Sequence, residues 1–431
     1  MVNKTGQQLY KQQIEFHGWD AYEIGNGLIR LVAVPDIGGR VMAYDLGEYD
    51  FLFVDRDLSG KLFNPEENQG DGSLAAWKNY GGEKTWPSPQ GWENNDQWAG
   101  PPDSILDSGR YQLDDFNVTA ETASIKVTSP LGSPTGLQII RQVTIHPGSS
   151  RVMLDLSFRN ISQRKIRWSI WDVVQLQAEH RSPEGILTPE TDCVVTAPLN
   201  PFSRFDQGYK VMFGDLHNPQ WKADQQAGLF FGDYQWEIGK VGLDSRAGWA
   251  AFANKTLQQV FTARYTAFPD EEYPDLGAGV EFWTVGRGKV ANLDYKQSQI
   301  YLMELEILSP FQQIEPGQAA SFQIEWGACR CPGPILDVTE GGCASQKLQA
   351  WREADSIKLT GSFGVFELGS LKVEWLDLAG KVLEVNDLGK VSPLRPVLLD
   401  FKNSFLKEAS RAQLKVISKS AEFVLASATI S

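Results

Sequence analysis

The sequence predicts an all-β fold, and two observations carry that prediction. Short runs rich in β-branched and aromatic residues recur along the chain, and Gly, Pro, Asn or Asp bound each of them. Convincing amphipathic helices are scarce over the same 431 residues. The spacing of the runs favours an antiparallel β-sandwich.

The first expected strands form a hairpin. Residues 24–34 ("IGNGLIRLVAV") alternate, the chain turns at residues 35–39 ("PDIGG"), and a second strand follows over residues 40–46. Later strands are expected at residues 124–129, 137–145, 152–158, 166–176, 228–234, 248–253, 280–284, 300–308 and 320–326. One helical pattern, "CASQKLQAWREA", predicts a helix over residues 343–354.

A domain boundary is predicted within residues 327–345 ("GACRCPGPILDVTEGGCAS"), which are rich in Gly, Pro and Cys. Residues 1–330 are long enough for one large two-sheet β domain. Beyond the boundary the aromatic density drops and short amphipathic strands recur, so residues 345–431 predict a small C-terminal β domain. Roughly 85 residues are enough for a small sandwich.

Charge and hydropathy exclude several kinds of partner. The chain has 40 basic and 54 acidic residues and a net charge of −14, which repels phosphate backbones and anionic membranes. No apolar run approaches the roughly 18 residues of a membrane span, and the N-terminus lacks the apolar core of a secretory signal. We therefore expect no nucleic-acid or membrane partner and a cytoplasmic location, with the oligomeric state left open.

The cysteines and histidines predict no metal and no cofactor. Four cysteines in a chain of this length do not make a disulfide scaffold. Cys329 and Cys331 are separated by one residue, which is too tight for a C-x-x-C motif, and no histidine lies nearby. Buried thiols are the expected outcome.

The chain contains the stretches "VPDIGGRVMAYDLG", "KNYGGEKTWP" and "EILSPFQQIEPGQAASFQIEW". Together they resemble the galactose mutarotase-like superfamily, and within it an uncharacterised bacterial family. "VPDIGGRVMAYDLG" resembles the opening hairpin, and "EILSPFQQIEPGQAASFQIEW" resembles the closing strands. "KNYGGEKTWP" is similar to the segment in which aldose 1-epimerases carry a sugar-binding Asn-x-x-His-Gly-Gly motif. The resemblance covers about residues 20–330 and implies a β-supersandwich with sugar chemistry on its concave sheet.

The resemblance also implies site residues, with two departures. Glu306, or Glu304, is the counterpart of the epimerase general base. Tyr80 stands where the first epimerase motif has histidine. Trp171, within "SIWDVVQL", stands where the second motif has the histidine that acts as general acid.

Carboxylates are expected to converge on one sheet. Strand periodicity places Glu304 and Glu306 on one face, and Glu281 lies on a preceding strand that is able to pair with theirs. Carboxylates that share a site repel one another, which raises at least one pKa towards a useful general-base value. The alternative is a solvated face whose carboxylates pair with Lys or Arg.

Four of the fourteen tryptophans lie within residues 77–98, a range that includes the glycine- and proline-rich stretch "NYGGEKTWPSPQGW". This composition predicts an irregular, rigid segment rather than a regular strand. Flat indoles match the C–H face of a sugar, and amide or charged side chains match its hydroxyl rim. The expected sugar contacts here are Asn79, Lys84, Trp86, Gln90 and Trp92. The alternative is that the tryptophans plug the ends of the sandwich.

Further candidates come from other segments. Arg40 follows the Gly-Gly turn and is suited either to a ligand or to pairing with a nearby Asp. Trp171, Asp172 and Gln175 are expected on a strand that lines the cavity, although Asp172 points opposite to Trp171 unless a bulge intervenes. His180 and His217 lie in loops and are candidates for the missing acid.

These observations predict a carbohydrate-active protein with aldose 1-epimerase-like acid–base chemistry on a small sugar or oligosaccharide. Glu306 or Glu304 takes a proton from the anomeric hydroxyl, while Tyr80, Lys84 or a loop histidine protonates the ring oxygen. Two alternatives stay open. One is a non-catalytic carbohydrate-binding or scaffold module, and the other is a polysaccharide lyase or hydrolase in which Tyr80 is the base and Arg40 neutralises a uronate. Each sugar hypothesis needs the carboxylates near position 305 and the indoles near position 86 to border one cavity.

Overall fold

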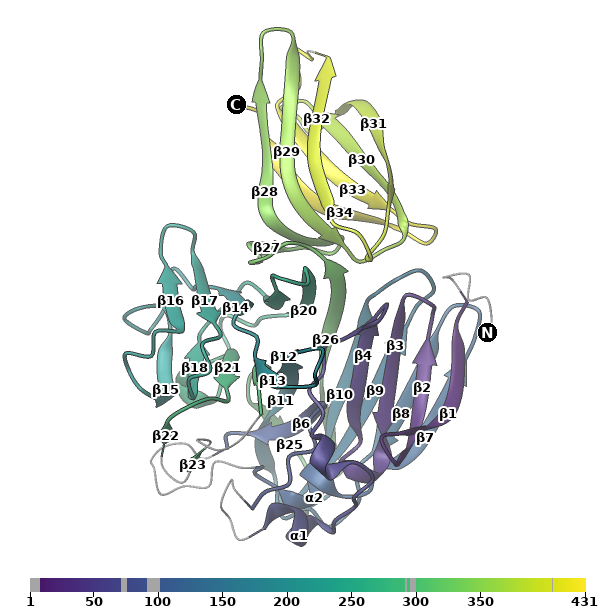
Figure 1. The fold of residues 1–431 in the computed structure, drawn as a ribbon, viewed down its shortest axis with the longest axis vertical. Coiled ribbons are helices and arrows are strands. Elements are labelled where there is room, and N and C mark those ends of the chain that lie inside the picture. The colour runs from purple at the N-terminus through teal and green to yellow at the C-terminus, as the bar shows by residue number, and fades with distance from the viewer. Residues whose placement is uncertain (1–7, 71–75, 91–100, 291–292, 295–299, 405) are drawn as a thin grey trace.

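The computed structural model describes residues 8–70, 76–90, 101–290, 293–294, 300–404 and 406–431. Two large antiparallel sheets, built between residues 10 and 330, lie face to face, and two four-stranded sheets follow in residues 337–429 (Figure 1). The prediction of an all-β fold is therefore confirmed.

The first sheet has twelve strands. Its main path runs through β1 (Tyr10–Phe16), β2 (Trp19–Gly25), β3 (Ile29–Val34), β4 (Arg40–Leu46), β6 (Glu83–Ser88), β11 (Ile166–Gln177), β24 (Leu302–Leu308), β21 (Val280–Thr284), β18 (Gly239–Leu243) and β15 (Lys210–Gly214). Two short strands extend it, β5 (Tyr49–Asp50) beside β4 and β25 (Gln312–Ile314) beside β11.

The second sheet has ten strands. They are, in spatial order, β16 (Trp221–Asp224), β17 (Leu229–Asp233), β14 (Cys193–Pro198), β19 (Trp249–Asn254), β20 (Gln259–Tyr265), β26 (Ala319–Arg330), β10 (Val152–Asn160), β9 (Leu137–Ile145), β8 (Ala123–Thr128) and β7 (Gln112–Val118). The remaining elements are short: hairpins β12 (Glu179–Arg181)–β13 (Leu187–Pro189) and β22 (Lys289–Val290)–β23 (Leu293–Asp294), helices α1 (Pro65–Gln69) and α2 (Ser104–Ser108), and 3₁₀ turns η1 (Pro35–Ile37), η2 (Arg56–Leu58) and η3 (Asp275–Gly277).

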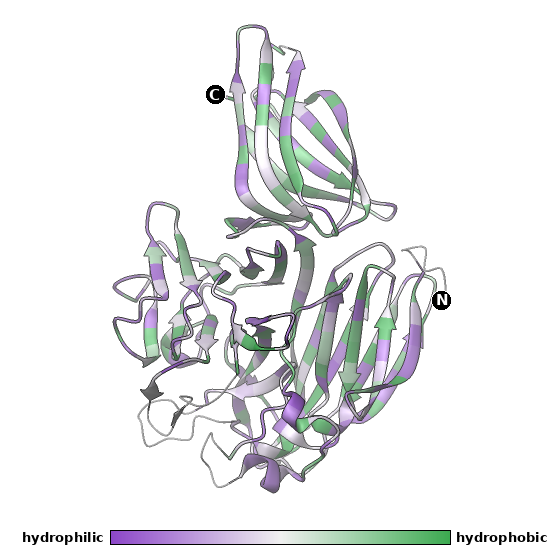
Figure 2. Cartoon of the chain, viewed as in Figure 1, coloured by the Kyte–Doolittle hydropathy of each residue, from purple (hydrophilic) through white to green (hydrophobic). Residues whose placement is uncertain are grey.

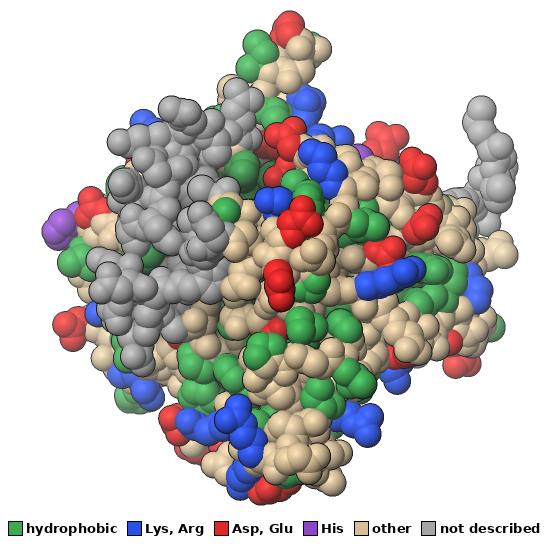
Figure 3. Space-filling model, turned by 90° about the horizontal axis from the view of Figure 1, so that it is seen from below, with side chains coloured by type: hydrophobic (Ala, Val, Ile, Leu, Met, Phe, Trp, Pro, Cys, Tyr) green, Lys and Arg blue, Asp and Glu red, His purple; other side chains and the backbone are tan. Residues whose placement is uncertain are grey.

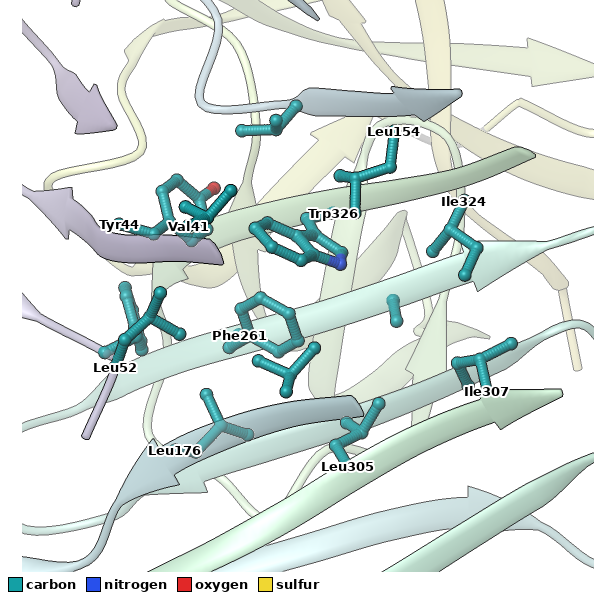
Figure 4. Close-up of a cluster of buried hydrophobic side chains, with 14 of the residues drawn as sticks. Val41, Tyr44, Leu52, Leu154, Leu176, Phe261, Leu305, Ile307, Ile324 and Trp326 are labelled. Atoms are coloured by element: carbon teal, nitrogen blue, oxygen red, sulfur yellow. The ribbon is translucent and has the colours of Figure 1, made fainter. Parts of the chain in front are cut away.

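The main hydrophobic core fills the space between these two sheets (Figure 4). Leu305 and Ile307 of β24 point into it from the first sheet, and Phe261 of β20 and Trp326 of β26 point into it from the second. All four side chains are fully buried. Because neighbouring residues of a strand point to opposite faces, the even-numbered residues of β24 point away from this core.

Strand positions follow the sequence closely, with two corrections. The predicted strand over residues 24–34 is a hairpin, because Asn26-Gly27 turns the chain between β2 and β3 with Gly27 at φ 84°. The predicted helix over residues 343–354 is wrong. This segment forms β28 (Gly342–Arg352), in which Leu348 and Ala350 point into the same core two residues apart, as strand periodicity requires.

The segment expected to be irregular contains the regular strand β6 near the middle of the first sheet. Six of its residues pair with β11, from Ser169 opposite Ser88 to Val174 opposite Glu83. Its pairing with β4 is limited to one position, Val41 opposite Glu83. Pro87 is therefore tolerated, because its missing N–H has no ladder partner on the β4 side.

The C-terminal sheets pack against each other around a separate hydrophobic cluster. One sheet contains β27 (Asp337–Val338), β28, β29 (Ser356–Val365) and β32 (Val397–Ser404), and the other contains β31 (Val382–Val391), β30 (Gly369–Leu376), β33 (Arg411–Ile417) and β34 (Glu422–Thr429). Hydrophilic and hydrophobic residues alternate along these strands in Figure 2, as expected for strands with one buried face. Glu367 joins these sheets to the larger sandwich by accepting a hydrogen bond from Ser149 Oγ (2.6 Å) and pairing with Arg151 (2.8 Å).

The surface of the described part of the chain carries mixed side chains. On the described part of the face in Figure 3, acidic and basic side chains are intermixed with apolar ones. No helix in the described ranges is long and apolar enough to cross a membrane.

All four cysteines are buried free thiols, and Cys329 and Cys343 place their Sγ atoms 3.3 Å apart.

Candidate functional site

The candidate site lies on the outer face of the first sheet, which is the face turned away from the second sheet. Glu304 and Glu306 point to this face from β24, because Leu305 and Ile307 point to the core. Glu306 lies opposite Glu281 of β21. Strand pairing therefore brings three carboxyl groups to one surface from two neighbouring strands.

Lys240 of β18 binds two of these carboxyl groups. Its Nζ lies 2.7 Å from Glu281 Oε2 and 2.9 Å from Glu306 Oε2. Trp171 Nε1 also donates a hydrogen bond to Glu306 Oε2 (2.9 Å), and the Lys240 ammonium lies 4.6 Å from the centroid of the Trp171 ring. All four side chains are buried, so this ion cluster is shielded from water.

Burial and charge shift the pKa values in the ion cluster. Burial raises the pKa of Glu306 and Glu281, and the nearby Lys240 ammonium opposes part of that rise. Burial alone would lower the pKa of Lys240, but the carboxylates of Glu281 and Glu306 raise it overall. Lys240 is therefore held in its charged form, whereas Glu306 and Glu281 bind protons more tightly than exposed carboxylates do.

A second polar group lies beside the first. Lys84 of β6 places its Nζ 3.3 Å from Glu304 Oε1, and Gln175 Nε2 donates a hydrogen bond to the same oxygen (2.5 Å). Burial lowers the pKa of Lys84, with a partial opposing effect from Glu304. The Lys84 ammonium also lies 4.7 Å from the centroid of the Trp86 ring, a distance typical of a cation–π contact.

Two features give this arrangement chemical capacity. Glu306 Oε1 is buried and has no hydrogen-bond partner among the described residues, while Oε2 is occupied by Lys240 and Trp171. The Glu304 side chain is 14% exposed, and the neighbouring Lys84 side chain is 2% exposed. The outer face therefore combines a carboxyl group of raised pKa, an ammonium group of lowered pKa and two indoles, which is a set suited to proton transfer.

Arg40 takes the structural role that the sequence left open. Its side chain is fully buried, and Nη2 lies 2.6 Å from Asp107 Oδ1. Asp107 of α2 also accepts hydrogen bonds from Trp86 Nε1 (3.1 Å) and Trp77 Nε1 (2.9 Å). Asp107 is thus an orienting group for the indoles that the sequence analysis did not single out.

Asp172 points into the space between the sheets, away from Trp171. The pairing of β11 with β6 and β24 shows no bulge there, so the two neighbouring side chains take opposite faces. Burial raises the pKa of Asp172 well above its usual value, and the nearby Glu83 raises it further. Arg141 pairs with Glu83 in the same buried group. Asp172 belongs to the interior and does not reach the outer face.

Replacing Asp172 with asparagine is expected to stabilise the protein, and more so at higher pH. The pKa of Asp172 is higher in the folded than in the unfolded protein. The contribution of this carboxyl group to the free energy of unfolding is therefore greatest below about pH 3.9, and it falls by about 1.4 kcal/mol per pH unit up to the folded-state pKa. The asparagine side chain would not titrate and would keep a donor towards Glu83. Thermal unfolding of D172N at pH 5 and pH 9, beside the exposed control D270N, measures the effect. A D172N protein that is less stable than the parent at both pH values would contradict this account.

The remaining candidates on the tryptophan-rich stretch do not join the ion cluster. Tyr80 packs against Trp19 in a separate apolar cluster, and burial raises its pKa to about 12. Asn79 is half-buried, and its Oδ1 accepts a hydrogen bond from the Gly81 amide (3.3 Å). Gln90 is half-buried two positions beyond β6. Trp92 and Trp98 lie outside the described residues.

The two histidines expected in loops are exposed, but only His217 lies in a loop. His180 lies in β12, with its Nδ1 3.9 Å from Glu190 Oε2. His217 lies between β15 and β16, where its backbone amide donates to Asp215 Oδ1 (2.8 Å). Neither ring contacts the carboxyl and ammonium groups of the outer face.

Besides Asp107, two further groups of the site were missed by sequence reasoning. Lys240 sits in "GKVGL", where a lone lysine in an apolar run was a usable signal for a paired, buried cation. Asp275 accepts a hydrogen bond from Ser88 Oγ (2.9 Å), and burial raises its pKa while Lys240 lowers it. Its backbone has φ 52°, in the left-handed region, within a short 3₁₀ turn that no local pattern identified.

In the described part of the chain, no group of three or more His, Cys, Asp or Glu residues is placed to hold a metal ion. The carboxyl groups of the outer face are instead bound by Lys240, Lys84, Gln175 and Trp171, and among the described residues Glu306 Oε1 has no partner. The site therefore offers proton-transfer groups packed among buried indoles.

Comparisons with solved structures give distant likenesses. The chain is similar to the Slr1438 protein from Synechocystis sp. PCC 6803, with 13% identity, a TM-score of 0.43, and coverage of 74% of this chain and 99% of that one. It is also similar to a galactose mutarotase-like protein from Clostridium acetobutylicum, with 11% identity, a TM-score of 0.46, and coverage of 75% and 99%. A galactose mutarotase-like protein from Lactobacillus casei matches with 10% identity, a TM-score of 0.42, and coverage of 72% and 99%.

Sequence comparison gives one assignment. No curated protein matches the chain significantly. Residues 20–329, which include every strand of the two large sheets except β1, match the profile of the family described as "Domain of unknown function (DUF4380)". The chain therefore belongs to the DUF4380 family.

Proposed function

We propose that the protein binds a sugar on the outer face of its first sheet and catalyses aldose 1-epimerase-like proton transfer at the anomeric carbon. One observation carries the proposal: Glu306 presents a buried oxygen without a partner among the described residues, on the same face as the Lys84 ammonium. The pKa of the Glu306 carboxyl group is raised and the pKa of the Lys84 ammonium group is lowered, so both pKa values move towards pH 7. A base and an acid that exchange protons near neutral pH need such values.

In this mechanism Glu306 Oε1 accepts the proton of the anomeric hydroxyl. Lys84 donates a proton to the ring oxygen, the bond between that oxygen and the anomeric carbon breaks, and an open-chain aldehyde forms. Rotation about the next carbon–carbon bond exposes the other face of the aldehyde. The ring hydroxyl then attacks that face, its proton returns to Lys84, and Glu306 returns the first proton to the new anomeric hydroxyl. No net proton is consumed.

The indoles and Glu304 supply orientation. Trp86 and Trp171 are buried and lie edge to face, with ring centroids 5.4 Å apart; Trp86 packs against the Lys84 ammonium and Trp171 binds Glu306, so the pair orients the proposed acid and base. Glu304 is the more exposed of the two β24 carboxylates, and its Oε1 is already bound by Lys84 and Gln175. A sugar hydroxyl that binds Glu304 would therefore lie next to the proton donor.

Polarimetry tests the proposal. Freshly dissolved α-D-glucose, α-D-galactose, L-arabinose and D-xylose are incubated with the protein, and optical rotation is followed beside a blank without protein. We expect at least one sugar to reach equilibrium faster than its blank, because positioned proton transfer contributes about 10²–10⁴-fold to a reaction that water alone performs slowly. Equal rates with and without protein for every aldose would overturn the proposed chemistry.

A second candidate function, a sugar-binding module without turnover, is favoured by a different observation. Lys240 neutralises Glu281 and Glu306 within a fully buried cluster, as in a purely structural ion network. Quenching of tryptophan fluorescence by a sugar that the protein does not interconvert would support this function. The lyase alternative needs Arg40 free to neutralise a uronate, and its buried pair with Asp107 argues against that use.

A further inference from the structure

A groove opens at the junction between the C-terminal sheets and the larger sandwich. We name it the junction groove and define it by its lining residues, 368–370, 390–392, 394–397 and 417–419. Its volume is about 810 Å³, which lies within the range of small-molecule and oligosaccharide sites. Backbone hydrogen bonds from Leu368 N to Gly148 O and from Arg330 N to Pro393 O tie its edges to the larger sandwich.

The charge of the junction groove is opposite to that of the whole chain. Its charged lining residues are Lys390, Arg395 and Lys419, and all three are basic. The chain as a whole has 54 acidic against 40 basic residues. A local cluster of cations in an acidic protein raises the concentration of anions at that position.

Sheet register places one of these cations, Lys390, beside the apolar lining of the groove. Ser370 of β30 pairs with Lys390 of β31 on one side and with Ile417 of β33 on the other, so these three residues form a row across the groove. Lys390 Nζ donates to Ser370 Oγ (3.0 Å), which holds the ammonium above the sheet. Leu368 and Leu394 complete the apolar lining.

Arg395 is the strongest candidate for direct ligand contact. It is exposed in the turn between β31 and β32. Its guanidinium forms no ion pair and no hydrogen bond with any residue in the described ranges. A planar guanidinium forks onto carboxylate, sulfate or phosphate oxygens with two parallel hydrogen bonds.

A second groove continues the first. It has a volume of about 630 Å³ and shares Leu368, Ser418 and Lys419 with the junction groove. Its lining adds His146, Arg151, Glu121 and Glu367; Arg151 pairs with Glu367 (2.8 Å) and stacks on Phe423 with 4.2 Å to the ring centroid. The second groove is therefore mixed in charge, and an elongated ligand that spans both grooves would place its acidic groups over the cations of the junction groove.

We propose that the two grooves form a binding site for an acidic oligosaccharide, separate from the outer face of the first sheet. The apolar lining packs against the C–H faces of the sugar rings, and Lys390, Arg395 and Lys419 bind carboxylate or sulfate groups on their rims. A bare inorganic anion would bind the three cations but would make no contact with the apolar lining of the groove. A saccharide contacts both, so the apolar lining favours a saccharide. The site does not depend on the chemistry proposed for Glu306.

Calorimetric titration of the full chain tests this proposal. The probes are tetragalacturonate, a sulfated tetrasaccharide, neutral maltotetraose and inorganic pyrophosphate, each at about 50 and about 300 mM NaCl. We expect one of the two acidic oligosaccharides to bind, more weakly at the higher salt because ions screen exposed charges. Which of them binds distinguishes carboxylate from sulfate recognition. Maltotetraose and pyrophosphate are expected to bind at least about tenfold more weakly than the preferred probe.

Matched variants locate the site. R395Q is expected to lower the affinity for the preferred probe about tenfold, and the triple variant K390Q/R395Q/K419Q should abolish measurable binding. The control K347Q/K381Q/K407Q removes the same charge from exposed positions outside the groove and should retain affinity. Every substituted position in both triple variants is exposed, and equal melting temperatures verify folding. No binding by either acidic oligosaccharide, tighter binding of pyrophosphate, or full affinity in the groove variant would each overturn the proposal.

Discussion

Replacing Lys240 with methionine is expected to destabilise the protein by about 3–5 kcal/mol at pH 7, because it leaves two buried carboxylates without their cation. The methionine side chain nearly fills the volume of the lysine stem, so lost packing contributes little. Denaturant unfolding followed by tryptophan fluorescence measures the change.

The loss in K240M should depend on pH in a defined direction. Without the ammonium, burial raises the pKa values of Glu281 and Glu306 further above their unfolded value of about 4.3. The folded state then binds more protons than the unfolded state. The contribution of Glu281 and Glu306 to the free energy of unfolding is therefore greatest below about pH 4.3, and it decreases as the pH rises towards their folded-state pKa values. The difference between parent and variant is therefore expected to be larger at pH 8 than at pH 5.

Two controls isolate the charge. K222M removes a lysine that pairs with Asp233 in a largely exposed position, and it should change stability by less than about 1 kcal/mol. Adding E281Q and E306Q to K240M removes the uncompensated carboxylates and should restore part of the lost stability. A K240M protein within about 1 kcal/mol of the parent at both pH values would show that Lys240 does not neutralise a buried pair.

Replacing Glu306 with glutamine is expected to lower the rate of anomer interconversion by about 10²–10⁴-fold, because the amide keeps the shape of the carboxyl group but cannot accept the proton. Glutamine retains an oxygen for the Trp171 indole, so the fold should persist. Polarimetry with the preferred aldose, at equal concentrations of folded protein, measures the loss. E315Q, at an exposed ion pair with Lys165, is the matched control and should keep full activity.

The pH profile of the parent checks the same assignment. Activity needs Glu306 deprotonated and Lys84 protonated, which predicts a bell-shaped profile. The acidic limb should lie above the usual carboxyl pKa, because burial raises the pKa of Glu306. The basic limb should lie below the usual lysine pKa, because burial lowers the pKa of Lys84. An E306Q protein that retains both limbs and full activity would remove Glu306 from the mechanism.

Period-two alternation made much of the sheet architecture predictable. β4, β9 and β21 begin and end where the sequence placed strands, and the side chains of β9 and β21 alternate between the core and the opposite face. The same periodicity placed Glu304 and Glu306 on one face of β24. The prediction of a helix at residues 343–354 was wrong. Leu348 and Ala350 are only two apolar positions, and two positions do not distinguish the two-residue repeat of a strand from the repeat of a helix.

Pairing between distant strands was beyond local pattern. Nothing near Lys240 indicates that β18 lies beside β21, and nothing near Arg40 indicates that Asp107, 67 positions later, takes its guanidinium. β6 was missed for a related reason. The two glycines just before β6 and the proline within it look like loop signals, and only the limited pairing with β4 explains why the sheet accepts the proline.

The carboxylate of Asp107 has a consequence for how this family can diversify. It holds Arg40, Trp77, Trp86 and, through Oδ2, the Asn68 amide (3.2 Å). The tilt of both indoles is thus governed from a five-residue helix outside the sheet that carries Trp86. A substitution or a small shift in α2 would re-aim both rings at once, so the geometry of the proposed sugar site would change while every residue on the sheet stayed unchanged.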